Sequence, residues 1–237
     1  MLPRSLLADA RCPMPVSVLV NPMTLAEAVL VLLQKAAVPK CDVDEVDRDV
    51  RLQKIAFAIG RASELATCSN EFSAIGCRSI ASDDNLVAAE LFWLAEAETA
   101  VRSNVHRDEC SRYQCDAVRV RTASGFMTIH LARGLWQPHK PPRWSSLRWE
   151  SIRGDSLEAT SNAAWEAAKM LEGYRGMCGS TRGAFAGYAT GNRCSHPQAE
   201  SRARNTERVR SELVRLRVEE GHQASGIRHQ PEEEKEE

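Results

Sequence analysis

The sequence is poor in aromatic residues, which make up only 5% of its 237 positions. It also lacks an excess of charge of one sign, because 31 lysines and arginines stand against 32 acidic residues. A dedicated nucleic-acid-binding protein is usually basic, so this balance argues against nucleic acid as a partner. The most apolar stretch near the N-terminus, residues 16–33, is interrupted by Asn21, Pro22 and Glu27. It therefore predicts neither a membrane-spanning segment nor a signal peptide.

The sequence also lacks a Cys-x-x-Cys pair, and its eight cysteines are too few for a disulfide-rich scaffold of this length. A zinc site is therefore not expected, and no cofactor is predicted. Cys178 and Cys194 flank a glycine-rich stretch, and either a disulfide bond or two free thiols fits them. The same alternatives hold for Cys110 and Cys115, which lie in one polar segment. The remaining cysteines are predicted to be ordinary thiols: Cys12, Cys41, Cys68 and Cys77.

Apolar residues at helical spacing, together with capping residues, predict a mainly α-helical protein with one small irregular or β region. Helices are predicted over residues 51–66, 85–102, 144–152, 157–171 and 183–189, and a short strand pair over 117–120 and 125–129. Residues 50–195 are predicted to form one domain. Residues 1–49 are predicted as a helical extension and linker, and residues 196–237 as a charged helical stretch and an acidic tail. The helix over 200–219 either packs on the domain or mediates self-association.

One of the predicted helices carries two glutamates near its C-terminal end. On a helical wheel, the apolar residues Val87, Leu91 and Leu94 share one arc. Glu98 falls inside this arc, whereas Glu96 points to nearly the opposite side. Because loss of solvent raises the pKa of a carboxyl group, Glu98 is the predicted proton donor of an acid-catalysed reaction. The alternative is a glutamate at a helix end that simply reaches water.

Three short motifs follow one another in the chain. The first is Glu98-Thr99, preceded by LFWLAEA, the second is Gly134-Leu135-Trp136-Gln137, and the third is GAFAGYATG around Tyr188. In order and separation they resemble the lysozyme-like superfamily, in particular its soluble lytic transglycosylase domain, across residues 50–195. The chain departs from the family pattern at Thr99 (serine in the family), Trp136 (methionine) and Ala189 (asparagine). A helix motif expected near 163–171 also lacks its asparagine, so the chain resembles a divergent branch.

The resemblance implies a peptidoglycan-cleaving enzyme that acts on the β-1,4 bond between N-acetylmuramic acid and N-acetylglucosamine, with Glu98 as general acid and base. The implied substrate contacts are Thr99, Gly134, Leu135, Trp136, Gln137 and Tyr188. Glycan strands of peptidoglycan are the implied partner, and neither a metal nor a cofactor is implied. Action is then expected outside the cytoplasm, in the periplasm, the cell wall or a virion of bacterial or phage origin.

The motif residues have physical uses in such a site. Gly134 allows the backbone to approach a sugar closely, because glycine adopts angles that other residues avoid. Gln137 offers an amide to an N-acetyl or hydroxyl group, and Trp136 offers an apolar face. Tyr188 is expected to support the glutamate or to reach the sugar near the cleaved bond.

Two other functions remain open. A lysozyme-like module that binds glycan, or builds a virion, without catalysis is favoured by the missing asparagines. A helical interaction protein would act through residues 1–45 and 200–219, but it leaves the three motifs unexplained. Within the enzyme hypothesis, the transglycosylase reaction implied by the family uses one glutamate. Hydrolysis uses a second carboxylate, for which Asp108 and Asp116 are the candidates.

Overall fold

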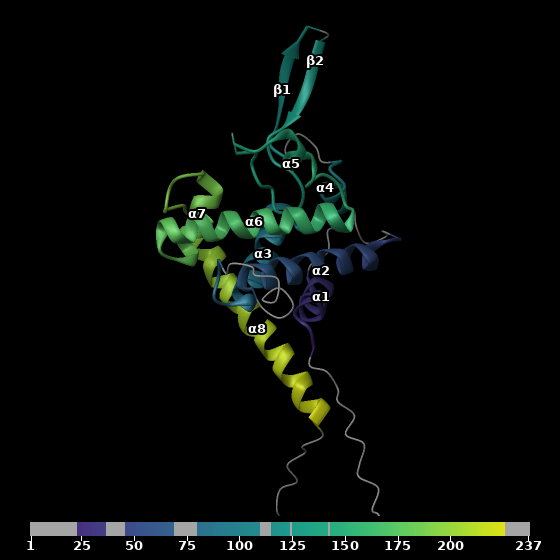
Figure 1. The fold of residues 1–237 in the computed structure, drawn as a ribbon, viewed down its shortest axis with the longest axis vertical. Coiled ribbons are helices and arrows are strands. Elements are labelled where there is room, and N and C mark those ends of the chain that lie inside the picture. Colours follow the sequence, from purple (N-terminus) through teal and green to yellow (C-terminus); the bar gives the residue numbers. More distant parts are fainter. Residues whose placement is uncertain are drawn as a thin grey trace, which may run out of the picture.

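The computed structural model describes residues 23–36, 46–68, 80–109, 115–123, 125–141 and 143–225. Within these ranges the protein is mainly α-helical with one small antiparallel sheet (Figure 1), so the predicted fold class is confirmed. The elements are α1 (Leu25–Lys35), α2 (Arg48–Thr67), α3 (Asp84–Thr99), α4 (Ser103–His106), β1 (Ala117–Thr122), β2 (Gly125–His130), α5 (Ser146–Glu150), α6 (Leu157–Cys178), α7 (Thr181–Thr190) and α8 (Ala199–Ser225). The predicted acidic tail and the expectations for Cys12, Cys41, Cys77 and Cys110 lie outside the described residues. None of the described helices combines the length and the apolar character that crossing a membrane requires.

The ends of α3 have identifiable local causes. The Asp83 carboxylate accepts the N–H of Leu86 at 3.1 Å and so caps the start of the helix. The helix ends at Thr99, before the predicted end at residue 102. Ala100 and Val101 adopt left-handed backbone angles, with φ of 48° and 52°, which an α-helix of L-residues cannot continue.

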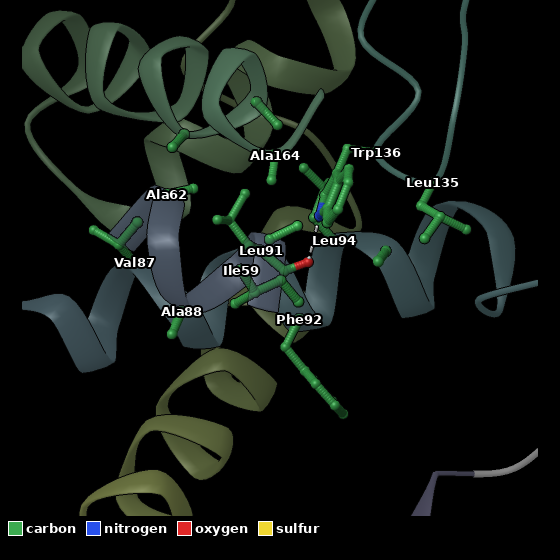
Figure 2. Packing of buried hydrophobic residues seen from close by; sticks show 14 of the residues in the cluster. Ile59, Ala62, Val87, Ala88, Leu91, Phe92, Leu94, Leu135, Trp136 and Ala164 are labelled. Carbon is green, nitrogen blue, oxygen red and sulfur yellow. Dashed lines mark hydrogen bonds between the residues drawn. The ribbon is translucent and has the colours of Figure 1, made fainter. Parts of the chain in front are cut away.

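α3 lies at the centre of the fold. Its Leu91 and Leu94 are fully buried beside Ile59 of α2 (Figure 2). The same hydrophobic cluster contains Leu33 of α1 and Leu213 of α8, both of which are also fully buried. Each such leucine stabilises the folded state by about 2 kcal/mol. The helices on either side of residues 50–195 therefore contribute to one shared core.

β1 and β2 form an antiparallel hairpin in which Ala117 lies opposite His130 and Thr122 lies opposite Gly125. The strand pair was predicted from sequence, and each strand extends beyond its predicted end. The hairpin projects away from the helices, at the end of the molecule opposite the C-terminal part of α8 (Figure 1).

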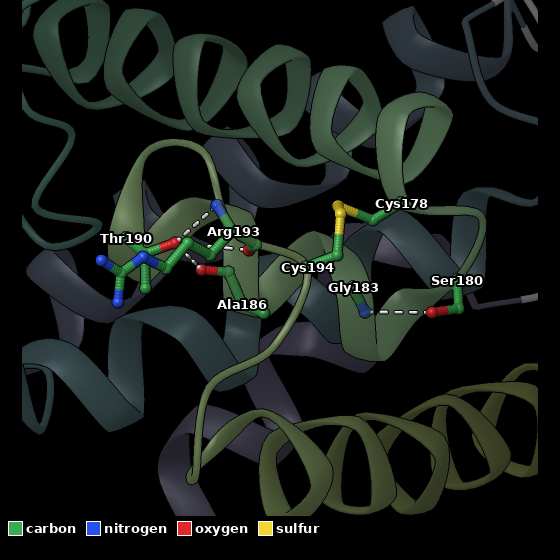
Figure 3. The surroundings of a disulfide bond; sticks show 7 residues. All are labelled: Cys178, Ser180, Gly183, Ala186, Thr190, Arg193 and Cys194. Carbon is green, nitrogen blue, oxygen red and sulfur yellow. Dashed lines mark hydrogen bonds between the residues drawn. A yellow bond between two sulfur atoms is a disulfide. The ribbon is translucent and has the colours of Figure 1, made fainter.

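A disulfide bond between Cys178 and Cys194 joins the end of α6 to the segment that follows α7 (Figure 3). Gly183 of α7 approaches this bond so closely that a Cβ on it would lie 2.4 Å from the Cβ of Cys178. Only glycine fits at that distance. Cys68 and Cys115 are also disulfide-bonded. The prediction of an ordinary thiol is therefore wrong for Cys68, which does not lie within a helix but directly follows the end of α2.

Candidate functional site

The candidate site is built around the C-terminal end of α3. Glu98 is the penultimate residue of this helix, and its side chain is 26% exposed. Its Oε1 accepts a hydrogen bond from Nη1 of Arg202, in the first turns of α8, at 2.5 Å. The Arg202 side chain is only 11% exposed, and it also donates to Oε1 of Gln198. Glu98 is thus held in an ion pair, rather than standing unpaired in an apolar pocket as the helical wheel predicted.

Thr99 links this helix end to the second motif. Its hydroxyl is buried and lies 2.8 Å from the carbonyl oxygen of Ala95 and 3.3 Å from that of Leu135. A hydroxyl has one proton and donates to one of these acceptors at a time. Residues that are 36 positions apart in the sequence are therefore in contact at this point.

The second motif forms a compact turn. Gly134 and Gln137 both have left-handed backbone angles, with φ of 61° and 48°. The Gln137 side-chain amide donates to the carbonyl oxygen of Gly134 at 2.6 Å, which fixes the shape of the turn. The Gln137 side chain is also buried, so the structure uses its amide inside the protein and does not present it to a ligand.

Leu135 and Trp136 of this turn are fully buried. The Trp136 indole N–H donates to the carbonyl oxygen of Leu91 at 2.9 Å, and the ring packs on α3 (Figure 2). A ring without exposed surface has no face to offer a sugar. This corrects the expected substrate contact of Trp136 and Leu135, whose roles in this structure are to pack the turn against α3.

Tyr188 of α7 brings the third motif to the same place. Its hydroxyl donates to the carbonyl oxygen of Trp136 at 2.8 Å, across 52 residues of sequence. Burial, followed by the negative charge of Glu98, raises the pKa of Tyr188 well above its usual value. The phenol is therefore neutral, and it lies close enough to Glu98 for the glutamate charge to affect its pKa.

Glu96 is a second carboxyl group in this region, and the helical wheel placed it nearly opposite the apolar arc of α3. In the structure, burial raises the pKa of Glu96. A helical wheel assumes one covered face, but α3 is covered on more than one side. Ala88, Ala89 and Phe92 are buried as well as Leu91. The signal was present in the sequence: α3 is apolar almost all round, which is typical of a helix inside a core.

The structure also contains a buried charge cluster that sequence reasoning missed. Glu90 of α3 is fully buried and forms an ion pair with Arg175 of α6, which Glu172 also contacts. Burial raises the pKa of Glu90 to about 7, although the charge of Arg175 opposes this change. Such a buried pair is a packing and stability feature unless a ligand reaches it.

The two candidates for a second catalytic carboxylate are bound elsewhere. Asp108 is nearly buried and pairs with Nε of Arg153 at 3.0 Å, beside a cavity of about 720 Å³ between β2 and α5. Asp116 pairs with His139 at 3.1 Å. Neither makes a described contact with Glu98 or Tyr188. Among the residues that the structure describes, no group of three or more metal-binding side chains comes together.

The structure thus joins three motifs that lie far apart in the sequence and leaves one carboxylate, Glu98, partly exposed at their meeting point. A carboxyl group in this position can exchange a proton with a bound ligand. No model of a protein family matches the chain, and no curated protein or solved structure is significantly similar to it.

Proposed function

We propose that the protein cleaves peptidoglycan at the β-1,4 bond between N-acetylmuramic acid and N-acetylglucosamine, with Glu98 as general acid and base. The observation that supports this proposal is the convergence of the three motifs. Thr99 contacts Leu135, Tyr188 contacts Trp136, and Glu98 directly precedes Thr99 at the end of α3. A catalytic site needs such a convergence, because its groups must be held in place by residues that are themselves fixed.

In the proposed reaction Glu98 donates a proton to the glycosidic oxygen while the bond from that oxygen to C1 of the muramic acid breaks. The resulting carboxylate then accepts the proton of the C6 hydroxyl of the same sugar, whose oxygen bonds to C1. The product is a 1,6-anhydro sugar, and no water is consumed. This route uses one carboxylate and leaves Asp108 and Asp116 in their ion pairs.

Turbidity loss of purified cell walls, followed by mass spectrometry of the soluble products, tests the proposal. Glu98→Gln should lower the rate by at least about 100-fold, since a positioned general acid contributes roughly that much or more. Glu96→Gln is the matched control, two positions away on the same helix, and should retain activity. Full activity of Glu98→Gln would refute the assignment. Anhydro-muramyl ends in the products would indicate a transglycosylase, and reducing ends a hydrolase.

A second candidate is a module that binds glycan without cleaving it. The ion pair between Glu98 and Arg202 favours this candidate, because Arg202 occupies a carboxylate oxygen that a general acid would direct at the glycosidic oxygen. Sedimentation with cell walls without release of soluble muropeptides would support this candidate over the enzyme.

A further inference from the structure

The β1–β2 hairpin has two chemically different faces. Opposite residues of an antiparallel pair share a face, and the faces alternate along each strand, so the register assigns every side chain. The apolar residues Val118, Val120, Met127 and Ile129 lie on one face, which we call the aliphatic face. Arg119, Arg121, Phe126, Thr128 and His130 lie on the other, which we call the basic face. On the basic face the Arg119 guanidinium lies over the Phe126 ring at 4.4 Å.

The helical body does not cover the aliphatic face. Its four side chains are between 37% and 51% exposed, and Phe126 beside the turn is 62% exposed. Figure 1 shows the hairpin projecting beyond the helices. A two-stranded sheet alone is only marginally stable in water, and a contiguous apolar surface marks a site of interaction. The hairpin is therefore suited to bury its aliphatic face against a partner.

Positive charge is concentrated around the hairpin. Residues 115–153 contain seven lysines and arginines against two acidic residues, although the whole chain is nearly neutral. Arg133, Arg148 and Arg153 form ion pairs. The other four cations, Arg119, Arg121, Lys140 and Arg143, have no carboxylate partner within the part of the chain that the structure describes. A partner for this surface should carry negative charge.

We propose that the hairpin docks on the surface of an anionic phospholipid bilayer. The aliphatic face lies at the boundary of the acyl chains, and the long side chains of Arg119 and Arg121 extend around the edges of the two-stranded ribbon to the headgroups. A bilayer surface supplies both the apolar layer and the negative charge that the two faces require. Nucleic acid would use the cations but leave the aliphatic face in water. A second copy of the chain would cover the aliphatic face but bring the same local excess of positive charge.

Co-sedimentation of the full chain with vesicles tests this proposal. We expect binding to vesicles of phosphatidylcholine mixed with phosphatidylglycerol, no binding to phosphatidylcholine alone, and weaker binding at higher salt. The double substitution Arg119→Gln and Arg121→Gln should weaken binding about 25-fold, because each basic residue near an anionic surface contributes about fivefold. The matched control, Arg182→Gln with Arg204→Gln, removes two exposed charges outside the hairpin and should bind as the unaltered protein does.

The aliphatic face is tested by Val120→Thr with Met127→Thr, which makes the face polar while retaining residues suited to a strand. This double variant should lose about tenfold or more in affinity. Val50→Thr, at an exposed position of α2, is its control. Equal binding to both vesicle types, or unaltered binding of either hairpin variant, would overturn the proposal.

Two further outcomes would assign the hairpin to another partner and likewise overturn the lipid proposal. One is a dimer in analytical ultracentrifugation that Val120→Thr with Met127→Thr abolishes, because the aliphatic face would then join two copies. The other is binding to duplex DNA that the arginine substitutions abolish and the threonine substitutions leave intact. Neither result depends on the activity of Glu98, so the proposal for the hairpin and the proposal for peptidoglycan cleavage can fail separately.

Discussion

Two buried titratable groups make opposite contributions to the pH dependence of stability. The pKa of Glu90 is raised from 4.5 to about 7, chiefly by burial. The folded protein therefore binds a proton there that the unfolded chain releases, so the stabilisation is present below pH 4.5 and lost as pH rises through 7. The pKa of His106 is lowered from 6.5 to about 3, chiefly by burial and then by the charge of Arg51. Its stabilisation is present above pH 6.5 and lost as pH falls toward 3.

The two contributions nearly cancel in the unaltered protein. At about 1.4 kcal/mol per pKa unit, the free energy of unfolding loses roughly 2–3 kcal/mol through Glu90 between pH 5 and pH 8, and gains about 2 kcal/mol through His106. The Glu90→Gln variant removes the first contribution only. Its free energy of unfolding should therefore rise by about 2 kcal/mol from pH 5 to pH 8, whereas that of the unaltered protein should change by less than about 1 kcal/mol.

Urea unfolding at the two pH values, followed by tryptophan fluorescence, measures these differences. The His106→Gln variant is the reciprocal control, and its free energy of unfolding should fall by roughly 2–3 kcal/mol from pH 5 to pH 8. Glu96, whose pKa is also raised, acts with the same sign as Glu90 but is present in all three proteins and so does not affect the comparison. If Glu90→Gln retained the pH dependence of the unaltered protein, the carboxyl group of Glu90 would not titrate as the structure indicates.

Three other predictions concern packing and pairing. In a double-mutant cycle of Glu98→Gln and Arg202→Met, urea unfolding should give a coupling energy of about 1–2 kcal/mol for this partly buried ion pair. Strictly additive effects of the two substitutions would mean that the pair does not form in solution. Gly187→Ala should destabilise the protein by about 2 kcal/mol, because the new Cβ would lie 2.5 Å from the ring of Tyr174 in α6. An unaltered thermal midpoint of unfolding would contradict this close approach. Replacing Cys178 and Cys194 by serine should cost about 3 kcal/mol, since their bond closes a loop with a sequence separation of 16, and urea unfolding of the double variant measures the loss.

Features that depend on short stretches of sequence were predictable. The spacing of Val87, Leu91 and Leu94 predicted the helix and its buried arc. The hairpin was predicted from its two runs of strand-forming residues. These features follow from interactions between residues that are a few positions apart, so no knowledge of the tertiary structure was needed.

Features that depend on distant residues were not predictable. Trp136 was expected to offer a face to a sugar, but its indole N–H reaches the carbonyl oxygen of Leu91, 45 residues earlier in the chain. Burial of Glu96 depends on which helices cover α3, and one helical wheel assumes a single covered face. The ion pair of Glu90 joins residues that are 85 positions apart. In each case the decisive neighbour comes from a part of the chain that carries no local signal of the contact.

The arginines of α8 explain why the surroundings of Glu98 differ from the expectation. Arg202 pairs with Glu98, Arg210 with Asp83, and Arg217 with Asp84. Arg202, near the start of α8, meets the end of α3, whereas Arg210 and Arg217, further along α8, meet acids at the start of α3. The two helices therefore run in roughly opposite directions. Their partners are 104 to 133 positions earlier in the chain, so in sequence these cations resemble those of a solvated helix. The cation that faces Glu98 thus comes from the charged helix predicted outside the 50–195 domain, and in a chain shortened before residue 199 Glu98 would lack this partner. Activity measured on such a fragment would report on a different site, so Glu98 has to be tested in the full chain.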